Sequence, residues 1–501
     1  MIKYILKILL LIAFLGFQSC NKQKAKSKEI QENKKPNIIF FFTDDQSYDS
    51  QKDYGNSVVK TPNLDILANK GVIFNRHYNT TAICMASRAN VMTGQYEYKT
   101  GCNFDHGSLK TKQWSTSYPV LLKKEGYQVG FAGKFGFSVS NTNGGWKKEG
   151  EVAKYDFDFW AGSPHQTSYK TIENKSLAKY AAEYPHSSRA YGAATIDFIN
   201  ASVEKKKPFC MSVYFKAPHR PVEPDPMFDD VYKDVVFDKL PNYGREAGKH
   251  LSKQSKMGRQ YPRFYEWGYD NEEDYQNALR KYHQLIYGVD YSIGMVLKEL
   301  KKLKIDDNTI IIFSSDNGYF NGSHGLGSKV LPYEEGARTP LIIVDPRSDN
   351  KHIKTDAITG NVDITATMLD FSGVEIPEIY DGKSLLPTLK KPTTQSRESL
   401  PIIQVWGPKE THCLTVMDNQ YKYIYWYYKD ESKNIQPTEE LFDIINDGYE
   451  MVNLANNAEY AEQLKKMRKL YDKQLEHWVE EGVKYNGYEK YSTLFTRNIN
   501  P

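Results

Sequence analysis

Short runs of β-branched and aromatic residues alternate along the chain with segments of helical periodicity, and this alternation limits the possible fold more than any other feature. Strands joined through helices are typical of a parallel sheet covered on both faces. The predicted strands of this sheet are residues 37–42, 128–132, 209–214, 309–314 and 341–344. Between residues 282 and 303, apolar side chains recur every three or four residues, which predicts a helix packed against the sheet. We therefore expect a large α/β domain with a mixed, mostly parallel sheet flanked by helices.

The large domain is predicted to span residues 36–389. Residues 389–401 follow it with the proline and polar content of a linker. Beyond the linker, an aromatic strand-like run at 420–428 and a helical pattern at 460–478 predict a small C-terminal α+β domain over residues 390–501.

The N-terminus has the features of a secretory signal. Two lysines precede an apolar run at residues 8–17, and small or polar residues lead up to Cys20. The run is shorter than the roughly 20 residues of a membrane-spanning helix, although an uncleaved anchor is the alternative.

Ser19 and Cys20, with Leu15 upstream, resemble a bacterial lipobox, in which residues 1–19 are removed and Cys20 is lipidated. Residues 20–35 are polar and suit a tether. We expect an exported protein that is anchored to a bacterial membrane by its lipid. It would lie on the periplasmic side or at the cell surface, and the outer membrane is favoured.

The composition excludes several classes of protein. The chain has 66 Lys and Arg against 62 Asp and Glu, and 13% of its residues are aromatic. Such a balance argues against a disordered polyelectrolyte and against a nucleic-acid partner. Five cysteines in 501 residues are too few for a disulfide scaffold.

Two of the predicted strands end in acidic residues. Asp44 and Asp45 follow the first strand, and Asp316 and Asn317 follow the strand at 309–314. Each pair alone could cap a helix. Together they place three carboxylates and an amide at one edge of the sheet, where repulsion is costly unless a cation lies among them. Hard oxygen ligands suit calcium or magnesium, and no Cys/His cluster in the sequence indicates zinc.

Cys84 begins a segment of small and polar residues that includes Arg88 and continues as a helix-compatible run. Most free cysteines are small buried apolar residues. At the start of a helix, however, backbone N–H groups and Arg88 would favour an anion, so the alternative is the precursor of a nucleophile.

The segment CMASR at residues 84–88 resembles the C-x-P/A-S-R signature of the type I sulfatases. Seven further segments resemble that family in its order: NIIFFFTDDQ, TPNLDILANKGVIFNRHY, FKAPHRP, SSDNG, GSKVLPYEEGARTPLII, VDITATMLDFSGVEIP and ELFDIINDGYEMVNLA. The resemblance implies an alkaline-phosphatase-like fold. It also implies hydrolysis of sulfate esters through a formylglycine, which a formylglycine-generating enzyme makes from Cys84.

The resemblance also implies roles for individual residues. One calcium ion would be held by Asp44, Asp45, Asp316 and Asn317, and would touch the modified Cys84. Arg88 would stabilise the modified residue, Lys134 and Lys329 would hold sulfate oxygens, and His219 would help to protonate the leaving alcohol. Candidate substrate-binding residues are Asp105, His106, Arg220 and His324, although Asp105 and His106 could form a turn and His324 could be an ordinary loop histidine.

One position departs from the family pattern. The family usually reads GKWH where this chain has GKFG, so the expected histidine is replaced by Gly136. His324 or His106 could replace that histidine, or release of sulfate is slow, or turnover is lost. A non-catalytic glycan-binding lipoprotein of the same fold is therefore an alternative. A phosphohydrolase of the same superfamily would need a Thr or Ser nucleophile and two zinc ions with histidine ligands. Cys84 and the acidic ligand set argue against that alternative.

The insertion between His219 and the helix at 282–303 is rich in basic and aromatic residues. It carries Arg245, Lys249, Lys253, Lys256, Arg259 and Arg263, interleaved with Tyr243, Tyr261, Phe264, Tyr265 and Trp267. It is either a solvated surface loop or a carbohydrate cleft. A lipoprotein of this kind resembles the polysaccharide sulfatases of Bacteroidetes-type bacteria. We expect a sulfated polysaccharide or its oligosaccharides as substrate, with algal ulvan or carrageenan favoured over glycosaminoglycans.

Overall fold

The structure is a computed structural model, and it describes residues 35–141 and 153–497. The predicted signal peptide, Cys20 and all but the last residue of the tether lie outside these residues. Within the described part of the chain, no helix has both the length and the apolar character needed to cross a membrane.

The main sheet has eight strands. In spatial order they are β5 (Phe159–Ser163), β4 (Gln128–Lys134), β6 (Phe209–Pro218), β1 (Asn37–Asp44), β7 (Thr309–Ser315), β8 (Leu341–Val344), β2 (Val72–Phe74) and β9 (Ile353–Thr355). Only β8 is antiparallel to its neighbours, which confirms a mixed, mostly parallel sheet. All five predicted strands are present, and four of them extend one to four residues beyond the predicted carboxyl end.

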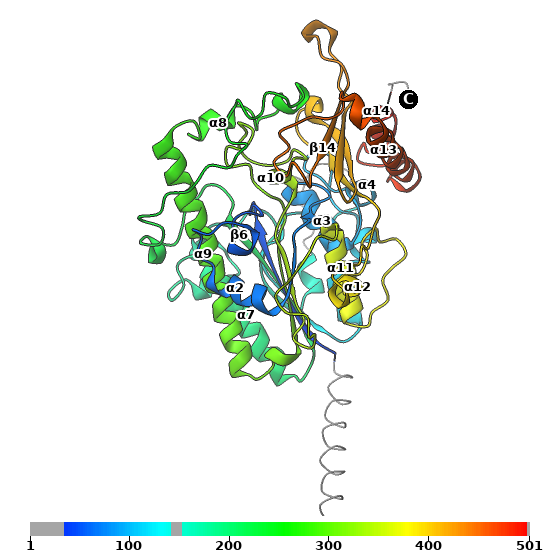
Figure 1. The fold of residues 1–501 in the computed structure, drawn as a ribbon. Helices are drawn as coiled ribbons and strands as arrows, with labels where there is room; N and C mark the ends of the chain where they lie inside the picture. Colours follow the sequence, from blue (N-terminus) through cyan, green and yellow to red (C-terminus); the bar gives the residue numbers. More distant parts are fainter. Residues whose placement is uncertain (1–34, 142–152, 498–501) are drawn as a thin grey trace, which may run out of the picture. The chain divides into compact units, whose positions relative to one another are not determined.

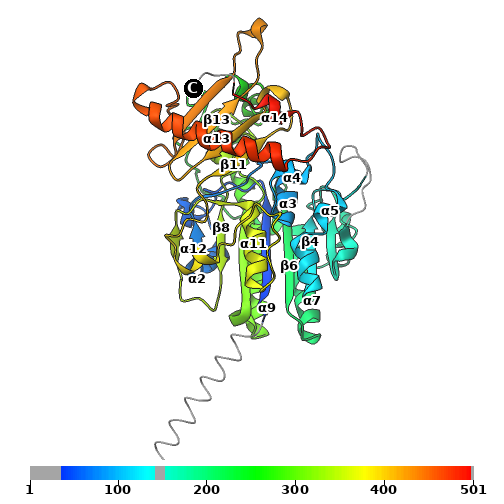
Figure 2. The same ribbon diagram turned by 90° about the vertical axis from the view of Figure 1, so that its right-hand side faces the viewer.

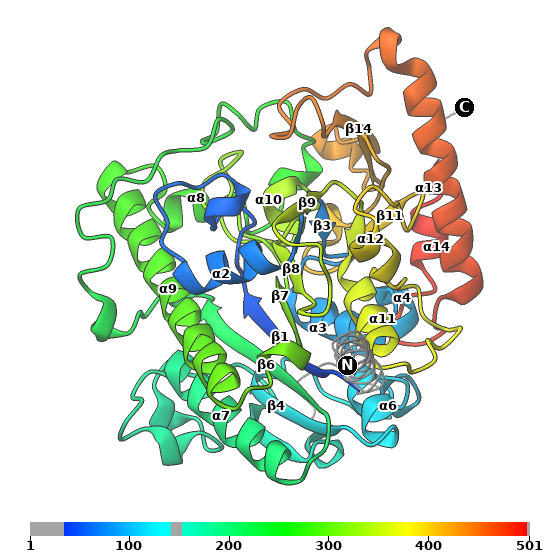
Figure 3. The same ribbon diagram turned by 60° about the horizontal axis from the view of Figure 1, so that its bottom comes forward.

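Strand β1 shows why the sheet is buried on both faces. Ile38, Phe40 and Phe42 point into one hydrophobic core, whereas Ile39 and Phe41 point into the other. Successive strand residues face opposite sides, so an uninterrupted apolar run requires cover on both. Helices α3 (Cys84–Thr93), α6 (Tyr118–Lys124) and α11 (Asn361–Phe371) cover the first face, and α2 (Pro62–Lys70), α7 (Ser187–Glu204) and α9 (Glu272–Lys302) cover the second (Figures 1 and 3).

Helix α9 begins ten residues before the predicted start at Tyr282. The side chain of Asn271 caps it by accepting a hydrogen bond from the backbone N–H of Asp274 at 3.1 Å. Acidic residues fill its first turn and lysines its last, as the helix dipole favours. Tyr275 and Leu279 are buried at helical spacing from Tyr282, so the apolar stripe begins further towards the N-terminus than the predicted range.

The C-terminal part forms a four-stranded antiparallel sheet of β11 (Leu400–Gln404), β12 (Cys413–Met417), β13 (Tyr421–Trp426) and β14 (Thr438–Asp443). Helix α13 (Ala461–Glu481) packs on one face of this sheet (Figure 2). The other face packs against Tyr78, Phe320 and Tyr333 of the main domain. A small α+β region at the C-terminus is thereby confirmed.

The remaining strands and α-helices of the described residues are short. They are β3 (His77–Tyr78), α4 (Glu97–Thr100), α5 (Thr111–Trp114), α8 (Arg263–Glu266), α10 (Glu334–Ala337), β10 (Thr359–Gly360), α12 (Leu386–Lys390) and α14 (Tyr491–Leu494).

Candidate active site

Four neighbouring strands, β4, β6, β1 and β7, carry polar residues at their carboxyl ends, the usual position of a ligand site in an open α/β sheet. The first residue of α3, its fifth residue and the loop after β7 complete the cluster. The structure brings together all nine residues assigned to catalysis or metal binding: Asp44, Asp45, Cys84, Arg88, Lys134, His219, Asp316, Asn317 and Lys329.

Side chains with possible metal-ligand atoms surround the Cys84 thiol. Its Sγ lies 3.4 Å from Asp44 Oδ1, and ligand atoms of Asp44, Asp45, Cys84 and His219 all lie within 4.8 Å of one another. The Asn317 amide donates to Asp45 Oδ1 at 2.7 Å, while its own Oδ1 is buried and has no hydrogen-bond partner. An unpaired buried amide oxygen beside carboxylates is a donor set that fits a hard divalent cation.

Three buried cations balance the three carboxylates. Lys134 Nζ lies 2.5 Å from Asp44 Oδ2. Lys329 Nζ contacts Asp45 Oδ1 and lies 2.7 Å from Cys84 Sγ. Arg88 Nε donates to Asp316 Oδ2 at 2.7 Å, and both side chains are completely buried. Cations held in this way can stabilise charge on a bound oxyanion.

The carboxylates differ in their proton affinity. Burial opposes ionisation of Asp44, but Lys134, His219, Arg88 and Lys329 together outweigh it and hold the pKa well below its usual range. For Asp316, burial and the charge of Asp44 raise the pKa to about 7. The nearby cations therefore do not fully offset the effect of burial on Asp316, and a divalent cation would favour the ionised form of both carboxylates.

The thiol and the imidazole are both neutral in this environment. Burial and Asp44 raise the pKa of Cys84 to about 11 although Lys134 and Lys329 oppose them. Burial lowers the pKa of His219 to about 4. The His219 Nδ1 contacts the Arg220 carbonyl oxygen, so Nδ1 carries the proton and Nε2 faces Asp45 at 3.8 Å.

Gly136 lies directly against Arg88. Its φ of +88° is in the left-handed region, and a Cβ added there would lie 2.6 Å from Arg88 Cδ. Arg88 cannot easily move aside, because Asp316 and the Lys134 carbonyl hold its guanidinium and the Phe42 and Tyr214 rings flank it at 5.6 and 5.4 Å. In this site, the position of the expected histidine has no room for any side chain.

Replacing Gly136 with alanine is therefore expected to displace Arg88 and lower kcat/KM by at least roughly tenfold, because the cation would lose its placement. Gly126→Ala is the matched control, since Gly126 has a φ of +86° and no atom within 4 Å of an added Cβ. The control should lose some stability and keep its kcat/KM. Equal loss of kcat/KM in both variants would contradict the role given to Arg88.

Two candidate substrate-binding residues support the C-terminal region. The His106 ring nitrogens lie 3.0 Å from the Asn486 carbonyl oxygen and 2.8 Å from that of Val405. Asp105 accepts a hydrogen bond from the Gly407 N–H at 2.7 Å. Both ring nitrogens of His106 are engaged with the chain itself, so it does not replace the missing histidine.

His324 is also separate from the acidic cluster, and it is 1% exposed. Its Nε2 lies 3.1 Å from the Asn242 amide nitrogen and 3.8 Å from Glu335 Oε2. His324, Glu335 and Glu450 form a second buried group, in which possible metal-ligand atoms lie within 4.8 Å of one another. The structure therefore places His324 in this second group and not among the nine clustered residues, and contact of His324 with a substrate stays a prediction.

Glu335 in this second group gives a pH-dependent prediction. Burial and the charge of Glu450 raise its pKa from 4.5 to about 8. Between these pH values the unfolded chain loses the proton and the folded protein keeps it, so stability falls as the pH rises. Glu335→Gln removes this titration, and its free energy of unfolding relative to wild type should increase from pH 5 to pH 8 by on the order of 2 kcal/mol.

Thermal unfolding of both proteins over this pH range measures the difference. Glu375→Gln, at an exposed position, is the control and should show no such trend. If the difference in free energy of unfolding between Glu335→Gln and wild type stays constant from pH 5 to pH 8, the raised pKa assigned to this buried carboxyl group is contradicted.

Some neighbours of the cluster were not singled out from the sequence. Lys216 is 7% exposed, lies 5.1 Å from the centre of the Tyr169 ring and interacts electrostatically with Asp44. Tyr169 donates a hydrogen bond to the His219 carbonyl oxygen at 2.6 Å. Lys216 lies in the FKAPHRP segment, three residues before His219, and this position could have marked it as a site residue. Nothing in the sequence indicated Tyr169.

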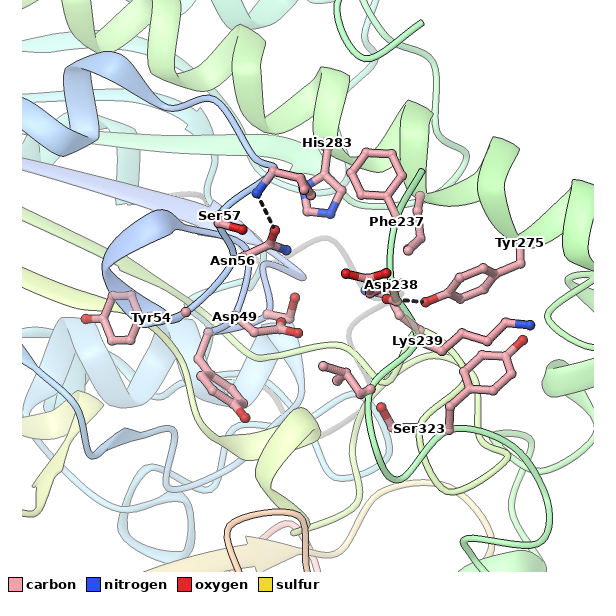
Figure 4. Close-up of a pocket in the computed structure, with 18 of the residues that line it drawn as sticks. Asp49, Tyr54, Asn56, Ser57, Phe237, Asp238, Lys239, Tyr275, His283 and Ser323 are labelled. Atoms are coloured by element: carbon pink, nitrogen blue, oxygen red, sulfur yellow. Dashed lines mark hydrogen bonds between the residues drawn. The ribbon is translucent and has the colours of Figure 1, made fainter. Parts of the chain in front are cut away.

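A cavity of about 210 Å³ is lined in part by the loop that follows Asp45 (Figure 4). Asp49, Tyr54, Asp238, Lys239 and His283 are among its lining residues. None of the nine clustered residues lines it, so this cavity is distinct from the cluster.

Comparison with known proteins agrees with the geometry of the cluster. The profile of the family described as "Sulfatase" matches residues 36–374, and that of "N-sulphoglucosamine sulphohydrolase, C-terminal" matches residues 322–477. The chain belongs to the sulfatase family, and it is a sulfuric ester hydrolase.

The chain is similar to several individual members of the family. It is 29% identical to an N-acetylglucosamine-6-O-sulfatase of Bacteroides thetaiotaomicron, over 93% of this chain and 90% of the relative. It is 25% identical to an ulvan-active sulfatase of Formosa agariphila, over 98% and 91% of the two chains. A protein solved in complex with its substrate D-glucosamine-2-N,6-O-disulfate superposes with a TM-score of 0.73 at 26% identity, covering 91% of this chain and all of that one.

Proposed function

We propose that this protein removes sulfate from a sulfated polysaccharide or its oligosaccharides, using a formylglycine derived from Cys84. The observation that carries the proposal is the position of Cys84 as the first residue of α3, between three carboxylates and three buried cations. The similarity to sulfatases that act on N-acetylglucosamine and on ulvan supports a glycan substrate.

The acidic residues would hold the metal. Asp44, Asp45, Asp316 and Asn317 offer oxygen ligands, and the unpaired Asn317 Oδ1 fits the preference of calcium for carboxylate and carbonyl oxygens. When bound, calcium would polarise the sulfuryl group and neutralise charge that develops on its oxygens.

A formylglycine hydrate at position 84 would supply a hydroxyl nucleophile, and its second hydroxyl would provide the route for sulfate release. Lys134 and Lys329 would bind sulfate oxygens, since their ammonium groups already lie beside Asp44 and Cys84 respectively. Arg88, held by Asp316, would stabilise the oxygen at position 84.

His219 would assist departure of the alcohol. Its Nδ1 keeps its proton against the Arg220 carbonyl, so Nε2 is the atom that faces the cluster. Nε2 would first take up a proton from solvent, which the negative charge of a bound sulfate ester would favour, and would then pass it to the leaving oxygen. No histidine takes the place of the one missing at Gly136 among the residues placed here, so release of sulfate would depend on the lysines, on Arg88 or on water.

A panel of sulfated glycans tests the proposal, with 4-nitrophenyl sulfate as a small aryl ester. We expect release of inorganic sulfate from at least one glycan family with kcat/KM above that for the aryl ester. The preference for ulvan or carrageenan over glycosaminoglycans remains a prediction, and both groups belong in the panel. Glycan binding without sulfate release from the calcium-loaded, matured protein would favour the non-catalytic alternative.

The N-terminal sequence supports a further part of the proposal, that the protein is exported and anchored to a bacterial membrane through lipid on Cys20. Incorporation of labelled palmitate in the native host, lost in Cys20→Ser, is the expected result. Labelling that persists in the variant would contradict it.

A further inference from the structure

Three arginines gather around two tryptophans in the chain segments next to the acidic cluster. The guanidinium carbons of Arg220 and Arg263 lie 4.4 and 4.6 Å from the centre of the Trp267 ring, and that of Arg259 lies 4.0 Å from the centre of the Trp406 ring. Contact with an aromatic face fixes a guanidinium while leaving its N–H groups available for hydrogen bonds to other groups.

Trp406 connects Arg259 to the nucleophile. It packs against the hydrophobic cluster of Ile83, Ala86 and Val330. Ile83 directly precedes Cys84, and Val330 directly follows Lys329. Arg259 is accordingly close enough to interact electrostatically with both Cys84 and Asp45.

Trp267 connects the other two arginines to the metal ligands. It stacks on Tyr319 with ring centres 6.1 Å apart and packs beside Tyr282, whose hydroxyl donates to the Asp45 carbonyl oxygen at 2.7 Å. Arg263 interacts electrostatically with Asp45, and Arg220 follows His219 in the chain.

The charge of this arginine group is only partly compensated by acidic groups of the protein. In the described part of the chain, none of the three guanidinium groups has a carboxylate oxygen within 4.0 Å. Arg88, Lys134 and Lys329 differ from them, since each pairs with an aspartate. Burial and, after it, the like charge of Arg263 lower the pKa of Arg259 to about 10. A bound anion would stabilise the charged form of these arginines.

The other basic residues of the insertion are engaged elsewhere. Lys249 pairs with Glu246, and Lys253 donates to the Asn434 carbonyl oxygen. Lys256 donates to the carbonyl oxygen of Lys249. Arg245 donates to the Tyr261 carbonyl oxygen at 2.6 Å. Of the six basic residues noted in the sequence of the insertion, Arg259 and Arg263 are thus the two that interact with residues of the cluster.

We propose that Arg220, Arg259 and Arg263 form a second anion subsite beside the reacting sulfate, and that the preferred substrate carries a second oxyanion group, a sulfate or a carboxylate, close to the scissile ester. This inference rests on the proposed function and narrows its substrate class. Guanidinium groups bind sulfate and carboxylate oxygens through paired N–H donors, so either group suits the site. Trp267 and Trp406 position the arginines, rather than offering free faces to a sugar ring.

The test compares four substrates: a mono-sulfated sugar, the same sugar with a second sulfate, the mono-sulfated sugar linked to a uronate, and 4-nitrophenyl sulfate. Wild-type protein should have a kcat/KM about 10- to 100-fold higher for a doubly anionic sugar than for the mono-sulfated one. The better of the two doubly anionic sugars identifies sulfate or carboxylate as the second group.

The variants are Arg259→Gln, Arg263→Gln and the double variant, with Lys249→Gln as the matched control in the same insertion. The double variant should raise KM for the doubly anionic sugar at least tenfold more than for 4-nitrophenyl sulfate, and the control should match wild type. Hydrolysis of 4-nitrophenyl sulfate without any preference for a second anion, or equal losses on all substrates, would overturn the subsite alone. Failure of wild type to hydrolyse any sulfate ester would overturn the proposed function and the subsite with it.

Discussion

Cys84→Ala is expected to abolish sulfate ester hydrolysis, with a loss of at least roughly 1,000-fold in kcat, because alanine cannot be converted into the nucleophile. The fold should survive, since Cys84 contributes a small side chain at the start of α3 and is one of four buried free cysteines in the described residues. Sulfate release measured on the best glycan, together with thermal unfolding, checks both parts.

Cys102→Ala is the matched control, because Cys102 is equally buried but belongs to the hydrophobic core on the first face of the sheet. It should keep its kcat and lose only stability. Full activity in Cys84→Ala would remove Cys84 from the reaction, whatever the control does.

Asp45→Asn is expected to have the second large effect, lowering both calcium affinity and kcat/KM by at least roughly 100-fold. Asp45 contacts Lys329, accepts a hydrogen bond from Asn317 and lies opposite His219, so its charge holds several groups of the cluster in place. Calorimetric titration of metal-free protein with calcium measures the affinity, independently of turnover.

Asp49→Asn provides the control for a nearby carboxylate. Asp49 lies four residues further along the same loop and lines the separate cavity. Its replacement should leave calcium affinity within about threefold of wild type, since it is not a ligand. Unchanged calcium binding in Asp45→Asn would contradict the proposed ligand set.

The sequence predicted the strands and the edge of the sheet well, for a physical reason. Runs such as residues 37–42 are apolar at every position because both faces of β1 are buried, and acidic residues directly after such a run mark the carboxyl end of the strand. The helix start at Cys84 was also predicted, and the structure confirms it.

Other features depend on contacts between distant segments and could not be predicted from the sequence. Gly136 looked like a lost histidine, but a Cβ added there would lie only 2.6 Å from Cδ of Arg88, which is 48 residues away along the chain. His106 and His324 were attractive because histidine often serves in active sites, yet both are engaged by backbone or buried partners. The arginine group depends on Trp406, which comes from the C-terminal part and follows β11.

The most direct test of the central claim is the mass of the peptide that contains Cys84, taken from protein purified from its native host or co-produced with a formylglycine-generating enzyme. Conversion of the thiol to an aldehyde lowers the mass by about 18 Da. We predict this loss at Cys84, with sulfatase activity that rises in proportion to the converted fraction. An unmodified thiol in a fully active preparation would contradict the account.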